Sequence, residues 1–456
     1  MKIKKVFILI AITIAIAMLA VLFTNIFSKF EISDETLIGM KDKKVASGHI
    51  EIPNSVTKIA NRAFANCTDL TSVTIPKSVT EIGNRAFENC TNLTSVTILD
   101  GVTEIGNRAF KDCTNLLSVT IPDSVKNIGM ESFEGCTSLE SVTIPEGLNK
   151  IRASTFEGCT NLTTVRISEG VTLIEDDAFK GCTSLDSVTI PKSVTAIGNS
   201  AYNDCTSLTS VTIQDGVIWI QDDAFNGCTS LESVTIPKSM IEIGNSAFND
   251  CTSLTSVIIP DGVTEIQDDA FNGCTSLESV TIPKSVKKIG NFAFYECTSL
   301  TSVTIPKSVK KIGYSAFNRC TSLLTVTIPD GVKNIDTATF RHCSSLTSVT
   351  IPDGVTVIDT LAFQGCTSLT SVTIPDGVKN IGACAFDGCT NLAPFKIPKE
   401  VSDKTTMDMI RYTPYEPADY MRPSDHHKKT EDEKLFEEVK EGLTELYKQN
   451  NWPGAE

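Results

Sequence analysis

One 23-residue unit recurs about fifteen times along the chain, and it constrains the fold more than any other feature. The copy from residue 251 to residue 273 reads CTSLTSVIIPDGVTEIQDDAFNG. Its apolar positions are Leu254, Val257, Ile259, Val263, Ile266, Ala270 and Phe271. A unit this short packs only on its neighbours, so the array is expected to grow lengthwise around one continuous core.

Each unit predicts one coil of a solenoid. The segment L-x-x-V-x-I is typical of a short strand, and the proline after it ends the strand because proline lacks a ladder N–H. An Asp-Gly or Lys-Ser pair then turns the chain. The remaining apolar residues are expected to return along the other side as a short extended or helical segment. The expected fold class is therefore an α/β repeat solenoid with a parallel sheet on one face.

The cysteines follow the same period. Fifteen of the sixteen, from Cys67 to Cys389, recur every 23 residues, and Cys384 lies outside the series. The sequence has no C-x-x-C pair and only four histidines, which excludes a typical zinc site. We expect a column of small buried thiols, one in each coil. A disulfide between neighbouring coils would fit the strand spacing, but an odd number of thiols cannot pair completely, so most are expected to be free.

The net charge and the near-identical loops argue against nucleic-acid binding and against catalysis. The net charge of −15, without any cluster of Lys or Arg in the repeats, argues against a nucleic-acid partner. Catalytic sites need unlike residues from distinct loops, and here every loop is the same loop. We therefore expect no enzyme activity, cofactor or small-molecule substrate. The pairs Asp222-Asp223 and Asp268-Asp269 raise calcium as an alternative, but the glycine-rich spacing of calcium-binding repeats is absent, so no metal is expected.

The amino terminus predicts membrane insertion. Lys2, Lys4 and Lys5 precede 23 uncharged residues, 6–28, which is long enough for a transmembrane helix. We interpret residues 1–28 as an uncleaved signal anchor, with a removed signal peptide as the alternative. The lysines place the amino terminus inside, so the repeats are exported to the cell surface, or secreted after cleavage in the alternative. Residues 29–44 are interpreted as a polar stalk.

The repeat resembles the BspA-like class of leucine-rich repeats over residues 45–401. Proteins of this class are displayed on microbial surfaces, and some act as adhesins for host or matrix proteins. The resemblance implies a curved solenoid with a binding role and no shared active site. Departures are Ser168 and Gln214 in place of Pro, and Tyr202 in place of Phe. The residues of one coil that carry the pattern are Cys297, Leu300, Val303, Ile305, Pro306, Val309, Ile312, Gly313, Ala316 and Phe317.

Two hydroxyl ladders are predicted on the outer face of the sheet, because nearly every coil has Ser or Thr on each side of its inward Val. One interpretation is that Thr suits strands and Ser is a soluble filler. The other is a broad, uncharged binding face for an extracellular protein or glycan. Ice binding through the same hydroxyls is a third alternative, which a curved sheet fits poorly. Representative ladder residues are Ser210, Thr212, Ser233, Thr235, Ser302 and Thr304.

Some outward residues break the unit. Trp219 replaces Glu or Lys, Arg166 interrupts the Thr ladder, and Phe292, Tyr295 and Tyr314 are aromatic at polar positions. Aromatic and Arg side chains dominate binding hot spots, whereas scattered exposed apolar residues are also ordinary drift. We predict that the last three residues form a small contact patch.

The carboxyl tail departs from the repeat. Residues 402–429 are polar and proline-containing, and we interpret them as a linker. Residues 430–450 begin with a capping box and place apolar residues on one face of an amphipathic helix. This helix either caps the open end of the solenoid or pairs with another chain.

Two functions follow from the sequence. The first is a membrane-anchored surface protein that binds proteins or glycans in adhesion. The second is a structural spacer or envelope scaffold without a host partner. Residues 205–250 and 251–296 are near copies, so the array is interpreted as lengthening by duplication, which fits either function. An intracellular interaction protein is a third alternative, and it requires that the repeats are not exported.

Overall fold

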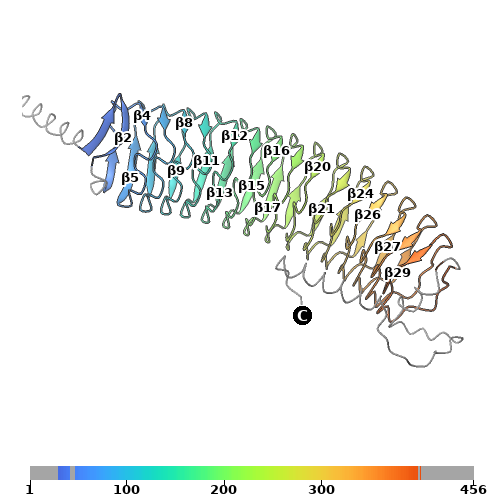
Figure 1. Cartoon of the computed structure of the whole chain (residues 1–456). Coiled ribbons are helices and arrows are strands. Elements are labelled where there is room, and N and C mark those ends of the chain that lie inside the picture. Colours follow the sequence, from blue (N-terminus) through green and yellow to red (C-terminus); the bar gives the residue numbers. More distant parts are fainter. Residues whose placement is uncertain (1–28, 42–46, 399–400, 402–456) are drawn as a thin grey trace, which may run out of the picture. The chain divides into compact units, whose positions relative to one another are not determined.

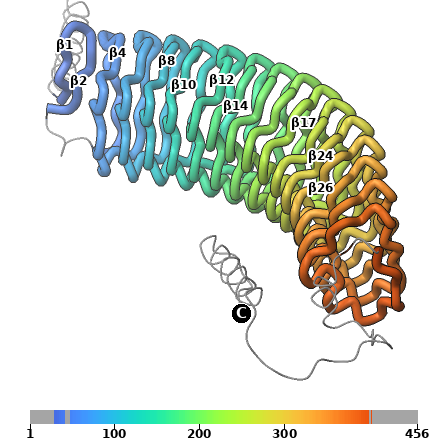
Figure 2. The backbone as a smooth tube through the Cα atoms, turned by 45° about the vertical axis from the view of Figure 1, so that its right-hand side comes forward, coloured from blue at the N-terminus to red at the C-terminus, as the bar shows by residue number. Residues whose placement is uncertain are grey.

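The computed structural model describes residues 29–41, 47–398 and 401. Over this part the chain is a parallel β-solenoid with a leucine-rich repeat fold, and its coils stack in chain order (Figures 1 and 2). The predicted signal anchor at 1–28, linker at 402–429 and helix at 430–450 lie outside the described residues. Within those residues, no helix has both the length and the apolar character that crossing a membrane requires.

The predicted parallel sheet forms one side of each coil and is confirmed. Its strands, which we call the long-strand row, pair in register with a 23-residue offset, as Val188 with Val211. Pairing is interrupted between β19 and β21, where Val234 is only partly buried. The row contains β3 (Gly48–Glu51), β5 (Leu70–Ile75), β7 (Ser95–Ile98), β9 (Ser118–Thr120), β11 (Ser141–Ile144), β13 (Thr164–Ile167), β15 (Ser187–Ile190), β17 (Ser210–Ile213), β19 (Ser233–Thr235), β21 (Ser256–Ile258), β23 (Ser279–Thr281), β25 (Ser302–Val303), β27 (Thr325–Thr327) and β29 (Ser348–Thr350).

A second side of the coil is made of two-residue strands, which we call the short-strand row. Each begins at the fifteenth residue of its coil, counting the cysteine as the first. The row contains β4 (Lys58–Ile59), β6 (Glu81–Ile82), β8 (Glu104–Ile105), β10 (Asn127–Ile128), β12 (Lys150–Ile151), β14 (Leu173–Ile174), β16 (Ala196–Ile197), β18 (Trp219–Ile220), β20 (Glu242–Ile243), β22 (Glu265–Ile266), β24 (Lys288–Ile289), β26 (Lys311–Ile312), β28 (Asn334–Ile335), β30 (Val357–Ile358) and β31 (Asn380–Ile381).

The third side corrects the expected α/β class, because residues 47–398 contain no helix. In the copy at 251–273, Asp269 has φ of 58° and Gly273 has φ of 72°, both left-handed. This conformation cannot continue a right-handed helix. Instead, the N–H groups of Asp269, Phe271 and Gly273 each donate 2.9 Å bonds to carbonyls of the next coil. The apolar Ala-Phe pair therefore lies in a hydrogen-bonded turn ladder, and the fold is a β-solenoid.

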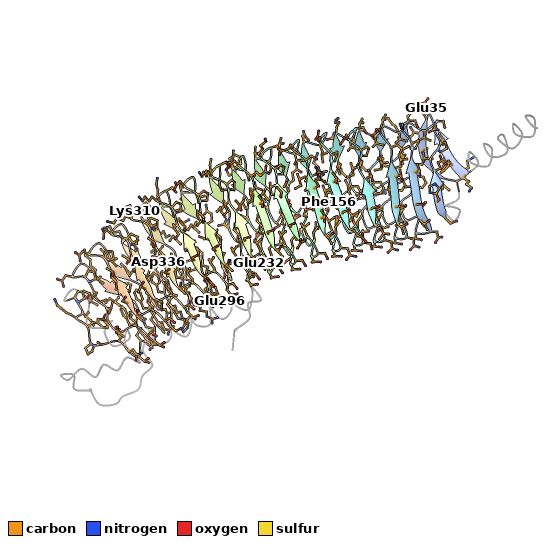
Figure 3. All side chains as sticks on the ribbon, turned by 180° about the vertical axis from the view of Figure 1, so that it is seen from behind. Glu35, Phe156, Glu232, Glu296, Lys310 and Asp336 are labelled. Carbon is orange, nitrogen blue, oxygen red and sulfur yellow. The ribbon has the colours of Figure 1, made fainter. Side chains whose placement is uncertain are left out.

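The phenylalanine of each coil forms a continuous stack in the core. Ring centroids of successive coils lie 4.9–5.6 Å apart, for example 5.4 Å between Phe225 and Phe248. Neighbouring rings are nearly parallel from Phe64 to Phe386, and these side chains are fully buried (Phe156 is labelled in Figure 3). Offset stacking of this kind adds to the free energy gained by burying the rings.

The cysteine column is buried, as predicted, and its thiols from Cys90 onwards are free. The Sγ of Cys251 lies 3.3 Å from the carbonyl oxygen of Phe225, to which it donates a weak hydrogen bond, and the same contact recurs along the column. Burial raises the pKa of the Cys136 and Cys251 thiols well above their usual range. These thiols therefore stay protonated and fill space in the core.

Tyr202 is the one exception in the ring stack among the described coils. Its ring keeps the stacked geometry, 5.1 Å from Phe179 and 5.3 Å from Phe225. Its hydroxyl is buried without a hydrogen-bond partner, and burial raises the pKa of Tyr202 well above its usual range. An unpaired buried hydroxyl costs about 1–3 kcal/mol of stability.

The variant Tyr202→Phe is expected to raise the free energy of unfolding by about 1–3 kcal/mol, because it removes the unpaired hydroxyl and keeps the ring. Urea denaturation of the full chain measures the change. The reverse substitution in the next coil, Phe225→Tyr, serves as the control and is expected to lower the same quantity. Equal stability of Tyr202→Phe and the wild type would show that the hydroxyl is solvated.

The amino-terminal end of the array is closed by a hairpin, and this corrects the predicted polar stalk. Strands β1 (Phe30–Ser33) and β2 (Thr36–Met40) pair antiparallel across a turn in which Asp34 and Glu35 have positive φ, and Glu35 lies at this end of the array in Figure 3. Strand β2 continues the short-strand row by pairing with β4. Phe30, Leu37 and Met40 are buried against the first coil. The segment lacks the 23-residue pattern, so its apolar residues carried no repeat signal.

The carboxyl-terminal end of the described array keeps an apolar core. Leu392 and Val401 are buried, and Phe395 and Ile397 pack partly buried against the core. The ring of Phe395 lies 5.3 Å from that of Phe386 but is tilted by 55°, so the parallel stack ends there.

Candidate binding surfaces

The hydroxyl ladders form on the outer face of the long-strand row, where they were predicted. Ser210 pairs with Ser233 and Thr212 pairs with Thr235 in the parallel register. Thr212, Ser233, Thr235, Ser302 and Thr304 are exposed, and Ser210 is half-buried. Because the intervening Val and Ile point inward, the ladder side chains point into solvent. This geometry offers an uncharged surface of hydroxyl groups.

Arg166 lies on the same face, in the Thr ladder. It pairs with Thr143 of the preceding coil and is exposed. Ile258 is a second interruption of the ladder, at the equivalent position of a later coil, and it is 71% exposed. Ile258 is not among the residues predicted from the sequence, although its replacement of a ladder Thr is a usable signal.

Of the three aromatic residues predicted as a patch, Phe292 contacts both of the others. Phe292 packs edge-on against Tyr314 at 4.9 Å between ring centroids, and against Tyr295 at 5.6 Å. Phe292 occupies a left-handed backbone position with φ of 53°. Tyr314 is 45% exposed, whereas Tyr295 is only 6% exposed. Tyr295 therefore supports the cluster from below and is not at the surface, which corrects the prediction that all three are exposed.

Trp219 lies in β18 of the short-strand row and is 44% exposed. It pairs with Ala196 on one side and with Glu242 on the other. Beside it is a hollow of about 310 Å³, lined by the polar residues Asn199, Gln221, Asp222 and Glu242. Ile220 and Gly244 complete the lining.

Two further apolar residues, which were not predicted from the sequence, flank Trp219. Ile218 precedes it, and Ile241 lies in the next coil, 53% exposed. The N–H of Ile241 donates to the carbonyl of Ile218 at 2.9 Å, so the two residues are neighbours across the stack. Their 23-residue spacing was a usable signal, since both occupy the fourteenth position of their coils.

The structure distributes the exceptional residues over different sides of the coil. Arg166 lies on the long-strand row, Trp219 on the short-strand row, and Phe292 and Tyr314 at the turn that follows the short strand. They therefore do not converge on one site. Of these places, the surface beside Trp219 combines an exposed aromatic ring with a hollow and polar side chains.

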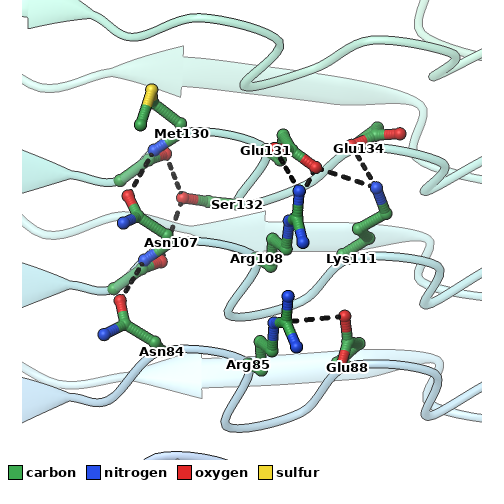
Figure 4. A network of polar contacts seen from close by, with 12 residues as sticks. Asn84, Arg85, Glu88, Asn107, Arg108, Lys111, Met130, Glu131, Ser132 and Glu134 are labelled. Atoms are coloured by element: carbon green, nitrogen blue, oxygen red, sulfur yellow. Dashed lines mark hydrogen bonds and ion pairs between the residues drawn. The ribbon is translucent and has the colours of Figure 1, made fainter.

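Polar side chains at the corner after the short strand connect neighbouring coils. The Oδ1 of Asn84 accepts from the N–H of Asn107 at 2.8 Å, and the Oδ1 of Asn107 accepts from the N–H of Met130 at 2.8 Å (Figure 4). Beside this ladder, Arg108 donates two hydrogen bonds to Glu131, of 2.7 and 2.8 Å. These contacts satisfy backbone N–H groups and charges between coils, so they are structural.

An ionic cluster of four residues extends from the same corner. Lys111 Nζ lies 2.9 Å from Glu131 and 2.6 Å from Glu134 (Figure 4). The hydrogen bonds from Arg108 hold the pKa of Glu131 down, at about 2. Burial raises the pKa of Glu134 although Lys111 opposes the shift. Glu131 is therefore the acid whose ionised form stabilises the fold.

The stabilisation by Glu131 is expected to depend on pH. Its folded pKa lies below the unfolded value of 4.5, so the contribution is complete above about pH 4.5 and is lost as the pH falls towards 2. Because the side chain remains partly in water, we expect about 1–2 kcal/mol. Glu131→Gln should therefore lower the free energy of unfolding at neutral pH but not near pH 2, by urea titration at each pH. A difference that is independent of pH would contradict this assignment.

The comparisons with known proteins identify the repeat. The family model described as "BspA type Leucine rich repeat region (6 copies)" matches overlapping stretches at residues 43–163, 103–232, 149–278, 219–346 and 264–393. Solenoids of this repeat class are typically non-enzymatic binding scaffolds, and the match indicates no catalytic family. No curated protein matches the chain.

Solved structures of bacterial repeat proteins are similar to this chain. A leucine-rich repeat protein from Bacteroides ovatus is 30% identical, with a TM-score of 0.59, and the alignment covers 81% of this chain and 93% of that protein. A leucine-rich cell surface protein from Faecalibacterium prausnitzii is also 30% identical, with a TM-score of 0.43, and the alignment covers 84% of this chain and 95% of that protein.

Proposed function

Because the chain belongs to the BspA-type leucine-rich repeat family, we propose that it is a surface-displayed binding protein whose solenoid contacts an extracellular partner in adhesion. The partner is a protein or a glycan of the host or its matrix. Residues 1–28 anchor the protein as a single-pass signal anchor, because their uncharged stretch follows three lysines. Secretion after cleavage of this segment is the alternative for localisation.

One observation carries this proposal. The core residues are almost invariant between coils, whereas the exposed aromatic and charged residues differ from coil to coil. Trp219, Tyr314 and Arg166 are large side chains held at the surface by a rigid, hydrogen-bonded scaffold. Rigid exposed aromatic and Arg residues supply binding free energy with little loss of conformational entropy. The array therefore separates a conserved core from a variable surface within one molecule.

The regularity of the array supports a second candidate function, a structural spacer or envelope scaffold. Residues 205–250 and 251–296 are near copies, and coils added in this way lengthen the molecule by about 5 Å each. A spacer needs length and solubility but no particular surface side chain. The two functions therefore differ in what the protein binds.

A pull-down with the full chain distinguishes the two functions. The purified protein is incubated with host matrix proteins and, separately, with the envelope fraction of its own cells. Saturable binding to matrix components supports adhesion. Retention of envelope proteins alone supports the scaffold. Protease added to intact cells is expected to remove the repeats, and repeats that survive this treatment would contradict surface display.

A further inference from the structure

An exposed apolar strip borders the hollow beside Trp219. We define the Trp219 strip as Trp219 of β18, Ile218 just before it and Ile241 just before β20. Trp219 and Ile241 are exposed, and Ile218 is half-buried. Ala196, buried at 6% exposure, pairs with Trp219 on the other side. The strip therefore joins apolar side chains from neighbouring coils into one surface, next to the polar lining of the hollow. Apolar surface of this kind gains free energy when a partner covers it.

An internal copy shows that the fold does not require the strip. Residues 251–296 repeat residues 205–250, and the pattern of buried apolar positions is nearly the same in both, except that Val234 and Ile236 are only partly buried where Val280 and Ile282 are buried. At the positions of Ile218, Trp219, Ile241 and Glu242, the second copy has the polar residues Thr264, Glu265, Lys287 and Lys288. The same backbone therefore accepts apolar or polar side chains at these positions. The packing of the core does not require the apolar residues of the first copy.

The two copies also differ in how they balance charge. In the second copy, Lys288 lies 3.4 Å from Glu265 and pairs with it. In the first copy, Trp219 replaces the acid and Glu242 replaces the lysine. The side chain of Glu242 makes no ion pair with any residue that the structure describes. Within the described residues, the carboxylate of Glu242 is therefore not neutralised by a cation of a neighbouring coil, whereas the Glu265 carboxylate of the second copy is paired with Lys288.

The surroundings of the strip are acidic over several coils. From residue 172 to residue 269, positions fourteen to nineteen of each coil hold no Lys or Arg. Lys180 follows this stretch in its coil and pairs with Asp177 at 3.1 Å. Outside this region, the same positions include Lys150, Arg152, Lys287 and Lys288. The acids of the region are Glu175, Asp176, Asp177, Asp222, Asp223, Glu242, Glu265, Asp268 and Asp269.

We propose that the Trp219 strip and its hollow are the docking site for a protein segment that carries an arginine or lysine beside apolar side chains. The cation lies against the indole of Trp219 and pairs with Glu242, while the apolar neighbours cover Ile218 and Ile241. Cations bind to the face of Trp, and charge-assisted hydrogen bonds to carboxylates are stronger than neutral ones. The hollow of about 310 Å³ accommodates one side chain. This inference rests on the proposed binding function and specifies its partner.

The internal copy supplies the variants that test the proposal. The double variant Trp219→Glu with Glu242→Lys recreates the Glu265–Lys288 ion pair of the second copy. It therefore preserves the fold, but it replaces the indole and the unpaired carboxylate with an ion pair inside the chain. Trp219→Ala removes the indole alone. The control is Leu324→Thr, which replaces an exposed leucine of a distant coil by the residue found at the same position, Thr301, in the coil before it.

The experiment presents the full chain and its variants to an array of random-sequence peptides, each also printed with Arg and Lys replaced by Gln. A subset of peptides is expected to lose about tenfold or more in affinity with both Trp219 variants and not with Leu324→Thr. The same subset should lose binding when printed with Gln, and should bind more weakly as salt is raised.

The proposal is overturned if no peptide depends on Trp219, or if the dependent peptides bind equally in their Gln form. Binding that depends on Trp219 on a glycan array alone would also overturn it. If the wild type still binds host matrix proteins in these cases, only this inference fails. If the wild type binds neither matrix proteins nor peptides nor glycans, the proposed function fails as well.

Discussion

Replacement of Phe248 by alanine is expected to lower the free energy of unfolding by about 3–5 kcal/mol. The ring of Phe248 is fully buried between Phe225 at 5.4 Å and Phe271 at 5.6 Å. The substitution removes the burial of the ring, leaves a cavity in a close-packed core and breaks both stacked contacts. In a repeat array, the free energy of unfolding is a sum of the stability of each coil and of the interfaces between neighbouring coils. A defect at one interface therefore also uncouples the unfolding of the coils before it from that of the coils after it.

Urea denaturation of the full chain measures this effect, and the broken coupling should broaden the transition or divide it into two. Phe395→Ala is the matched control. Among the residues that the structure describes, Phe395 contacts one ring, at a tilt of 55°, and it is partly buried. We therefore expect a loss of about 1–2 kcal/mol for the control. Equal losses for the two variants would show that the central stack does not couple the coils.

Replacement of Leu37 by aspartate is expected to detach the amino-terminal hairpin. Leu37 is fully buried and pairs with Ile59 of the first coil, whose neighbour Ala60 donates to the Leu37 carbonyl at 2.8 Å. An unpaired carboxylate cannot remain at this position, because burying an isolated charge costs several kcal/mol or more. Detachment exposes the apolar end of the core and the edge of β4, and open ends of repeat arrays associate.

The expected readout is a shift of the full chain towards higher mass in light scattering after size-exclusion chromatography. The adjacent residue provides the control, since Ile38 is 42% exposed and Ile38→Asp places its charge in solvent. The control is expected to keep the mass of the wild type. An unchanged mass for Leu37→Asp would mean that the hairpin does not protect the end of the array.

The core could be predicted from the sequence because its signal recurs in every coil. The inward residues of the copy at 251–273, from Leu254 to Phe271, are buried as their spacing indicated. The helical segment could not be excluded, because the left-handed backbone at Asp269 and Phe292 carries no glycine to mark it. The hairpin at residues 30–40 was missed because it lies outside the period, so that its single copy resembled a polar connection.

The candidate surfaces were predicted in part, for a related reason. A departure from the repeat pattern identifies single residues such as Trp219. The register of the short strands then determines which of these residues lie next to one another in the structure. Ile218 and Ile241 are 23 residues apart and lie side by side, whereas Arg166 and Trp219 lie on different rows. Tyr295 broke the polar pattern as Phe292 did, yet the structure buries it beneath the cluster. Burial at a turn depends on neighbouring coils and is not encoded in one unit.

One binding measurement tests the central claim, that the side chains which break the repeat are the binding residues. In a restored variant, Arg166→Thr, Trp219→Glu, Phe292→Ser and Tyr314→Asn return each position to a residue found there in other coils. Binding isotherms of the full chain and this variant are recorded on immobilised host matrix proteins, with urea denaturation as the control for folding. We predict saturable binding by the wild type and at least about tenfold weaker binding by the equally stable variant. Identical isotherms for the two proteins would contradict the account.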